Sequence, residues 1–123
     1  MESQKWIAEQ RFRCVPPEGG VFDLTIKIGE PMTVRQEDGP SRSFGKCKLA
    51  LLPLAADKWV SGGNQFQAMC LALDHIRVVF RVFLAEGGRI YWEDTNSHVD
   101  VDSVWFAPLP DAASLSLVGA ARA

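Results

Sequence analysis

Side chains able to bind a metal ion are concentrated in the acidic stretch 93–102. Asp94, His98, Asp100 and Asp102 occur there and, with Asn96, occupy every second position, as ligands do at the start of a calcium-binding loop. On a β-strand, every second side chain projects from one face about 6–7 Å from the next, which is close enough to share a cation. One hypothesis is therefore a small metal-dependent hydrolase that uses this hairpin, with these four residues as its ligands.

The remainder of the calcium-loop pattern is missing from this stretch. The glycine expected at the sixth position is Val99, and the bidentate acid expected at the twelfth position is Trp105. An acidic run of this kind is more often a solvated surface. The sequence therefore favours a protein with no metal and no cofactor, and the four ligands stay an alternative.

Two further stretches contain residues that occur in catalytic sites. The segment Gly39–Cys47 has five residues between its glycines, where a phosphate-binding loop has four, and Cys47 stands where that loop needs a hydroxyl. His75 follows Asp74 in sequence, but adjacent residues of a helix do not face each other. We therefore assign no catalytic residue.

Composition and charge describe one soluble globular domain. The chain has 123 residues, of which 47% are hydrophobic and 23% are charged, and this length suffices for a single core. The net charge of −2 gives no indication of nucleic-acid binding. No apolar stretch is long enough to cross a membrane, and no signal-peptide core follows the N-terminal residues. We expect neither nucleic acid nor a membrane as a partner.

The number and spacing of the cysteines indicate a reducing compartment. Cys14, Cys47 and Cys70 are an odd number at wide spacing, which fits neither a disulfide framework nor a zinc site. We expect free thiols and a cytoplasmic location. Cys14 and Cys47 also occupy inward positions of expected strands, so we interpret them as core residues.

The clearest structural prediction is one helix over residues 65–86. Asn64 can cap its first turn, Gln67 can complete a capping box, and Gly87 can adopt the left-handed conformation that ends a helix. Apolar residues at spacings of three and four predict a stripe that faces a core. These residues are Phe66, Met69, Leu73, Ile76, Phe80 and Phe83.

A second apolar stripe lies on the back of the same helix. Leu71, Val78 and Val82 fall together on a helical wheel, and His75 flanks them. A stripe of branched apolar residues is more often covered than left in solvent. Its cover is either the C-terminal segment 109–123 or another subunit, and these four residues are the predicted partner-binding surface.

Alternating patterns elsewhere predict strands. They cover residues 5–15, 21–28, 44–54, 89–93 and 98–106, with a polar loop over 29–43 and Trp59 in a loop before the helix. The expected fold is α+β, an antiparallel sheet of four to five strands with one long helix packed on one face. Residues 1–108 form its single domain, and 109–123 form a tail or a short helix. The predicted core is Phe22, Leu24, Ile26, Leu49, Leu51, Met69, Leu73, Ile76 and Phe80.

Three segments together resemble a family of small bacterial single-domain proteins of unknown function. The helix segment Gly63–Ile76 has a glycine, then a Gln-Ala pair, then a Leu-Ala-Leu run. The strand Cys47–Leu52 begins with a cysteine, and the strand Ile90–Trp92 carries a tryptophan. The resemblance implies a bacterial source, and it implies no activity and no catalytic residue.

These observations favour a small cytoplasmic, non-enzymatic protein-binding module, acting through a protein partner or by self-association as a homodimer. An alternative is an immunity-type protein that neutralises a bacterial toxin, because such proteins are often compact, acidic single domains. The second alternative is the metal-dependent hydrolase.

Overall fold

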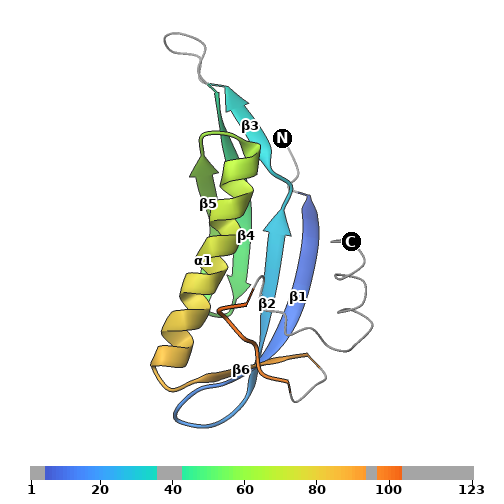
Figure 1. The fold of residues 1–123 in the computed structure, drawn as a ribbon. Helices are drawn as coiled ribbons and strands as arrows, with labels where there is room; N and C mark the ends of the chain where they lie inside the picture. The colour runs from blue at the N-terminus through green and yellow to red at the C-terminus, as the bar shows by residue number, and fades with distance from the viewer. Residues whose placement is uncertain (1–4, 36–42, 94–96, 104–123) are drawn as a thin grey trace, which may run out of the picture.

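The computed structural model of the protein describes residues 5–35, 43–93 and 97–103. Within these residues, six strands and one helix follow one another along the chain (Figure 1). They are β1 (Trp6–Val15), β2 (Phe22–Gly29), β3 (Met32–Arg35), β4 (Ser43–Leu52), β5 (Ala55–Gly62), α1 (Gln65–Ala85) and β6 (Arg89–Trp92).

All the strand pairs of the described sheet are antiparallel. β1 lies between β2 and β6, and β2 in turn pairs with β4. The first half of β4 pairs with β3 and its second half with β2, so β2 and β3 share one edge of β4. β5 pairs with β4 along its other edge. The α+β class and the antiparallel sheet are therefore confirmed, with more strands than we expected.

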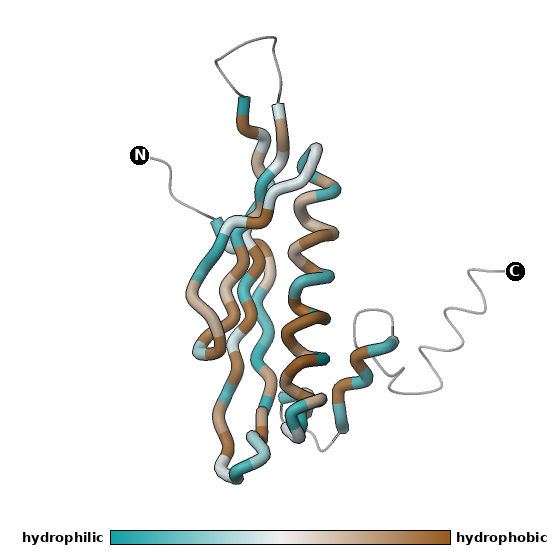
Figure 2. Tube along the Cα trace, turned by 90° about the vertical axis from the view of Figure 1, so that its left-hand side faces the viewer, coloured by the Kyte–Doolittle hydropathy of each residue, from teal (hydrophilic) through white to brown (hydrophobic). Residues whose placement is uncertain are grey.

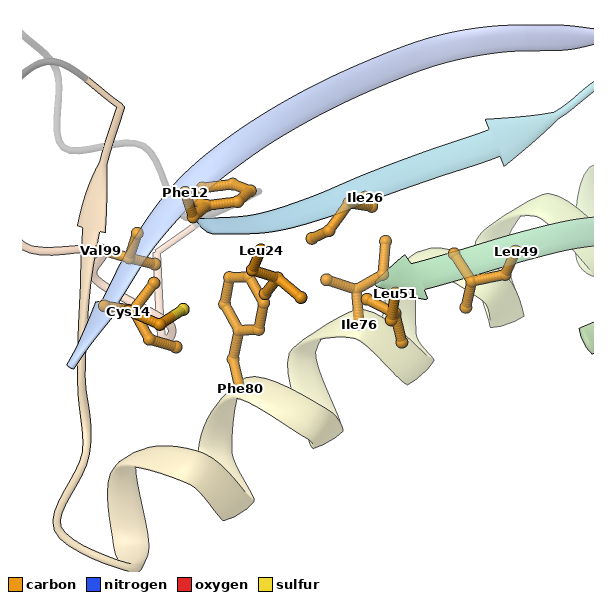
Figure 3. Packing of buried hydrophobic residues seen from close by; sticks show 10 residues of the cluster. Phe12, Cys14, Leu24, Ile26, Leu49, Leu51, Ile76, Phe80 and Val99 are labelled. Carbon is orange, nitrogen blue, oxygen red and sulfur yellow. The ribbon is translucent and has the colours of Figure 1, made fainter. Parts of the chain in front are cut away.

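The helix lies along one face of this curled sheet (Figures 1 and 2). Its buried residues, Ala68, Ala72, Ile76 and Phe80, recur every fourth position and face the strands. Side chains from α1 and four strands meet in one cluster (Figure 3). The buried members of this cluster are Phe12, Cys14, Leu24, Ile26, Leu49, Leu51, Ile76, Phe80, Ile90 and Val99.

Most of the predicted core lies in this cluster. Leu24, Ile26, Leu49, Leu51, Ile76 and Phe80 are buried in it, and Phe22 and Leu73 pack against it partly buried. Met69 instead packs on a smaller cluster formed by Cys47, Ala68 and Ala72.

The prediction that Phe66 faces the core is wrong. Its side chain is 72% exposed. Ala68 and Ala72 face the sheet at this end of α1, because the helix approaches the strands closely there. A Cβ atom added to Gly62 would lie 2.7 Å from the backbone nitrogen of Ala68. Large side chains have no room at this contact, and Phe66 is directed elsewhere.

Both ends of α1 follow the predicted chemistry. The Asn64 side chain accepts a hydrogen bond of 2.8 Å from the backbone N–H of Gln67. The Gln67 side chain accepts one from Gly63, which is one residue before the expected capping-box donor. At the other end, Gly87 has φ +100°, and the N–H groups of Gly87 and Gly88 donate to the carbonyls of Leu84 and Phe83.

Three predictions of local structure are wrong. The expected loop 29–43 contains β3, and Trp59 lies in β5 instead of a loop. The expected strand 98–106 forms only one bridge, between His98 and Tyr91, and the chain turns at 101–103. Residues 104–106 of that strand, and the tail 109–123, lie outside the described residues.

Candidate functional site

The acidic stretch does not form the strand that the metal hypothesis requires. The carboxylate of Asp100 accepts hydrogen bonds from the Ser103 hydroxyl at 2.8 Å and from the backbone N–H of Asp102 at 3.2 Å. These bonds hold a tight turn, which is why alternation of valines and aspartates here does not indicate a strand. His98, Asp100 and Asp102 therefore do not line up on one strand face, and that geometric prediction is wrong.

Each of these side chains has a different neighbour. The ring of His98 packs on Tyr91 with their centroids 4.5 Å apart. Asp102 forms an ion pair of 2.9 Å with Arg81 of α1. Among residues 5–35, 43–93 and 97–103, no three His, Cys, Asp or Glu side chains lie close enough to hold one metal ion. Asp94, the fourth candidate ligand, lies outside these residues.

The ion pair instead attaches the acidic turn to the helix. Arg81 holds Asp102, and the guanidinium of Arg77 donates a hydrogen bond of 3.2 Å to the carbonyl oxygen of Ser103. Val99, between the bridge and the turn, is 6% exposed and belongs to the core. The segment 97–103 thus packs along α1 on the side away from β5.

The side of α1 next to β5 carries exposed apolar residues. Leu71, Val78 and Val82 are 42%, 47% and 52% exposed, and Leu54, at the turn before β5, is 38% exposed. We call these four residues the edge surface. The first three are the predicted back stripe. Leu54 was not predicted to join them, because only the position of β5 brings this turn beside the helix.

Two shallow hollows connect the residues of the edge surface. One, of about 360 Å³, is lined by Leu71, Val78 and residues of β5. The other, of about 250 Å³, is lined by Leu54, Val82 and Phe83 among others. Val78 lines both hollows, so they adjoin each other along the part of α1 from Leu71 to Phe83. The lining residues of the first are Lys58, Trp59, Val60, Leu71, Asp74, His75 and Val78.

β5 itself is an edge strand within the described part of the chain. Its backbone pairs with β4 alone, so its other edge presents backbone N–H and C=O groups that no described strand uses. The strand was missed in the sequence because its pattern is weak. Lys58, not an apolar residue, stands on the helix side of the strand beside Val60.

His75 adjoins this edge. Its Nε2 atom lies 3.3 Å from the ammonium group of Lys58, which fits a neutral imidazole that accepts a hydrogen bond. Partial burial and the positive charge of Lys58 lower the pKa of His75, while the carboxylate of Asp74 raises it by less. His75 was predicted as a member of the partner surface, and it lines the first hollow.

The lowered pKa of His75 gives a pH dependence of stability. A histidine with a depressed pKa in the folded state binds its proton more readily when unfolded. The free energy of unfolding should therefore fall as pH drops from about 6.5, the ordinary value, through the folded pKa, and then level off. Chemical denaturation across pH 5 to 8 should show this decrease in the wild type and a smaller one in His75→Gln. Equal profiles in the two proteins would contradict this assignment.

The opposite face of the sheet pairs tryptophans with lysines. The Lys46 ammonium lies 4.1 Å from the ring centroid of Trp59, and Lys48 lies 5.8 Å from it. Lys27 and Lys48 both lie 5.7 Å from the ring of Trp6. These cation–π contacts link four neighbouring strands and stabilise the face.

Two of the three thiols, those of Cys14 and Cys47, are unsuited to nucleophilic chemistry. All three are free, and Cys14 and Cys47 are fully buried, which confirms their inward positions. Burial, with a smaller contribution from Asp23, raises the pKa of Cys14 to about 11, and burial raises the pKa of Cys47. The Cys47 thiol donates a hydrogen bond of 3.3 Å to the carbonyl of Gly29. Both groups stay protonated at neutral pH.

Comparison with protein-family models, with curated proteins and with solved structures finds no match for this chain. In the described residues, no helix has the length and apolarity needed to span a membrane.

Proposed function

We propose that this protein is a small non-enzymatic binding module that recognises another protein chain through the edge surface. The observation that carries the proposal is the continuity of this surface. Four apolar side chains, each between 38% and 52% exposed, lie beside an edge strand and are joined by two hollows. Contiguous exposed apolar surface next to unpaired strand backbone is typical of sites where proteins associate.

The chemistry of the surface supports a protein partner. Both hollows are shallow and are lined by side chains of β5, its preceding turn and α1. His75 and Lys58 are polar groups at the margin of an apolar centre, the arrangement found in protein interfaces. An immunity-type role against a bacterial toxin is one form of this proposal, in which the partner is the toxin.

The metal-dependent hydrolase receives less support than the binding module. His98 and Asp102 already have separate partners in Tyr91 and Arg81. A cation shared by them would require these contacts to break.

The proposal predicts that the edge surface, and no other apolar position of equal exposure, contacts a protein in the cell. A photo-reactive amino acid placed at Val78 should give a covalent protein adduct on irradiation. Adding Val82→Asp to the same chain should reduce the adduct at least about tenfold, because an unpaired carboxylate is costly to bury in an apolar contact. Adducts are measured by gel electrophoresis and mass spectrometry.

Ile7 in β1 provides a matched control. It is 49% exposed, against 47% for Val78, and both are β-branched. The same photo-reactive residue at Ile7 should give no such adduct. No adduct from Val78, or the same adduct from both positions, would contradict the proposed function.

A further inference from the structure

We propose that the partner at the edge surface is a second copy of this chain, joined by antiparallel pairing of the two β5 strands and contact of the two α1 helices. This inference rests on the proposed function and adds the identity of the partner. Two observations point to the same occupant: the edge of β5 that is unpaired in the described chain, and the apolar stripe that lies directly beside that edge. A second copy of this chain satisfies both, because it presents a strand edge and an apolar helix face layered in the same way.

The spacing of the layers fits such a pair. The helix packs over β4 and β5, with Ala68 and Ala72 against Cys47 and Val60. Neighbouring strands lie about 4.8 Å apart, so a helix above the boundary of β4 and β5 lies about 5 Å from the junction of β5 with its copy. The two helices would then be about 10 Å apart, which is the distance at which helices pack.

The side chains of β5 favour one register for the strand pair. The two-fold axis of such a dimer is perpendicular to the joined sheet. Opposed residues of antiparallel strands point to the same face of the sheet, so this axis passes between one residue of β5 and its own copy. That central residue defines the register. Centring on Asp57 or on Lys58 would place like charges directly opposite each other, which destabilises a pair. Centring on Ala56, Trp59 or Val60 avoids this, and among these only Trp59 opposes two tryptophans, a favourable cross-strand pair. Asp57 then faces Ser61 of the other copy.

The same axis brings the edge surfaces together. Trp59 lines the first hollow with Leu71 and Val78, and the preceding Lys58 contacts His75, so an axis through Trp59 would pass beside the helix between Leu71 and Val78. Leu71 of each copy would meet Val78 of the other, since the helices are antiparallel across the axis. Asp74 of one copy would also approach His75 of its partner, where the carboxylate can accept a hydrogen bond from the Nδ1–H group of the neutral imidazole.

Light scattering on the purified full chain tests the association. The mass should be twice 13.6 kDa, and Val78→Asp should raise the dissociation constant at least about tenfold with an unchanged circular dichroism spectrum, because the carboxylate would be buried against Leu71. Ile7→Asp, at an equally exposed position in β1, should remain dimeric. A mass of 13.6 kDa at every concentration up to about 1 mM would overturn the inference.

Disulfide trapping tests the register. In a Cys70→Ser background, which removes the one partly exposed native thiol, Trp59→Cys should form a disulfide-linked dimer under mild oxidation. Opposed residues of antiparallel strands have Cα atoms about 4.5–5.5 Å apart, within disulfide range. The double variant Asp57→Cys/Ser61→Cys, which keeps Trp59, should also cross-link.

Ser61→Cys alone is the control for this experiment. The two copies of residue 61 would be displaced by four positions along the strands, about 13 Å, which is too far for a disulfide. Cross-linking of this single variant as fast as Trp59→Cys would overturn the register. A monomeric purified chain that still gives a Val78 adduct with a different protein would overturn the second copy as partner and leave the proposed function standing.

Discussion

Replacing Phe80 by alanine should lower the free energy of unfolding by about 3–5 kcal/mol, as truncation of a buried aromatic side chain does. Phe80 is 0% exposed and lies where α1 meets the sheet (Figure 3). Its ring packs edge-on against Phe12 of β1, with the centroids 5.2 Å apart. The substitution would leave a cavity between the two layers that neighbouring side chains fill only in part.

Urea denaturation followed by circular dichroism measures this loss. The midpoint should fall while the slope with denaturant stays constant, since the surface exposed on unfolding is nearly the same. Phe66→Ala is the matched control. It removes the same ring from the same helix at a position that is 72% exposed, and its effect should stay within about 0.5 kcal/mol. Equal losses in the two variants would show that Phe80 does not join helix and sheet.

Adding one methyl group at Gly45 should be almost as damaging. Gly45 is buried in β4, and a Cβ atom there would overlap the carbonyl group of Asn64 and the nitrogen of Gln65. Those atoms are backbone, so no side chain can rotate away, and the start of α1 would have to move off the sheet. We expect Gly45→Ala to lower the free energy of unfolding by about 3 kcal/mol, at the upper end of overpacking effects.

The neighbouring Gly63 provides the comparison for this second variant. A Cβ atom at Gly63 would lie 3.0 Å from the side-chain oxygen of Gln67, which is exposed and can shift. Gly63→Ala should therefore change stability by less than about 1 kcal/mol. If Gly45→Ala unfolded at the same urea concentration as the wild type, the close approach of helix and strand would be absent in solution.

Local rules account for the parts of the fold that the sequence predicts well. The ends of α1 depend on single residues with particular chemistry, Asn64 and Gly87, and both function as expected. β2, β4 and the second half of β1 have alternating apolar residues because one of their faces is buried against the helix. Such patterns involve residues close together in the sequence, so they can be recognised without knowing which distant segments these residues contact.

The remaining elements depend on neighbours that are distant in sequence. β5 has Lys58 on its helix side, so its pattern shows no alternation, and β3 is only four residues long. The prediction for Phe66 is wrong because glycines in β4 and β5 let the helix approach the strands closely. At that distance, alanines of the helix face the sheet in place of large side chains. The valines and aspartates of 98–102 alternate as a strand would, but hydrogen bonds around Asp100 turn the chain.

Helical spacing predicts only one part of the edge surface. The stripe on α1 could be read from helical spacing, and its residues are exposed beside one another. The edge of β5 and Leu54 could not be added, because both depend on how β5 pairs with β4. A signal was present in the run from Leu54 to Gly62, where Trp59 and Val60 occur between charged residues and glycines.

The position of β1 determines the order in which the molecule can be completed during synthesis. β1 is the first strand described, yet one of its two neighbours is β6, the last strand described, with Phe12 opposite Trp92. The segment from β4 to α1 can form local contacts as soon as it leaves the ribosome, because its elements are consecutive. β1 pairs with β2 early but keeps its other edge open until residues 89–92 have been made, so the nascent chain carries one unpaired strand edge while residues 30–88 are synthesised.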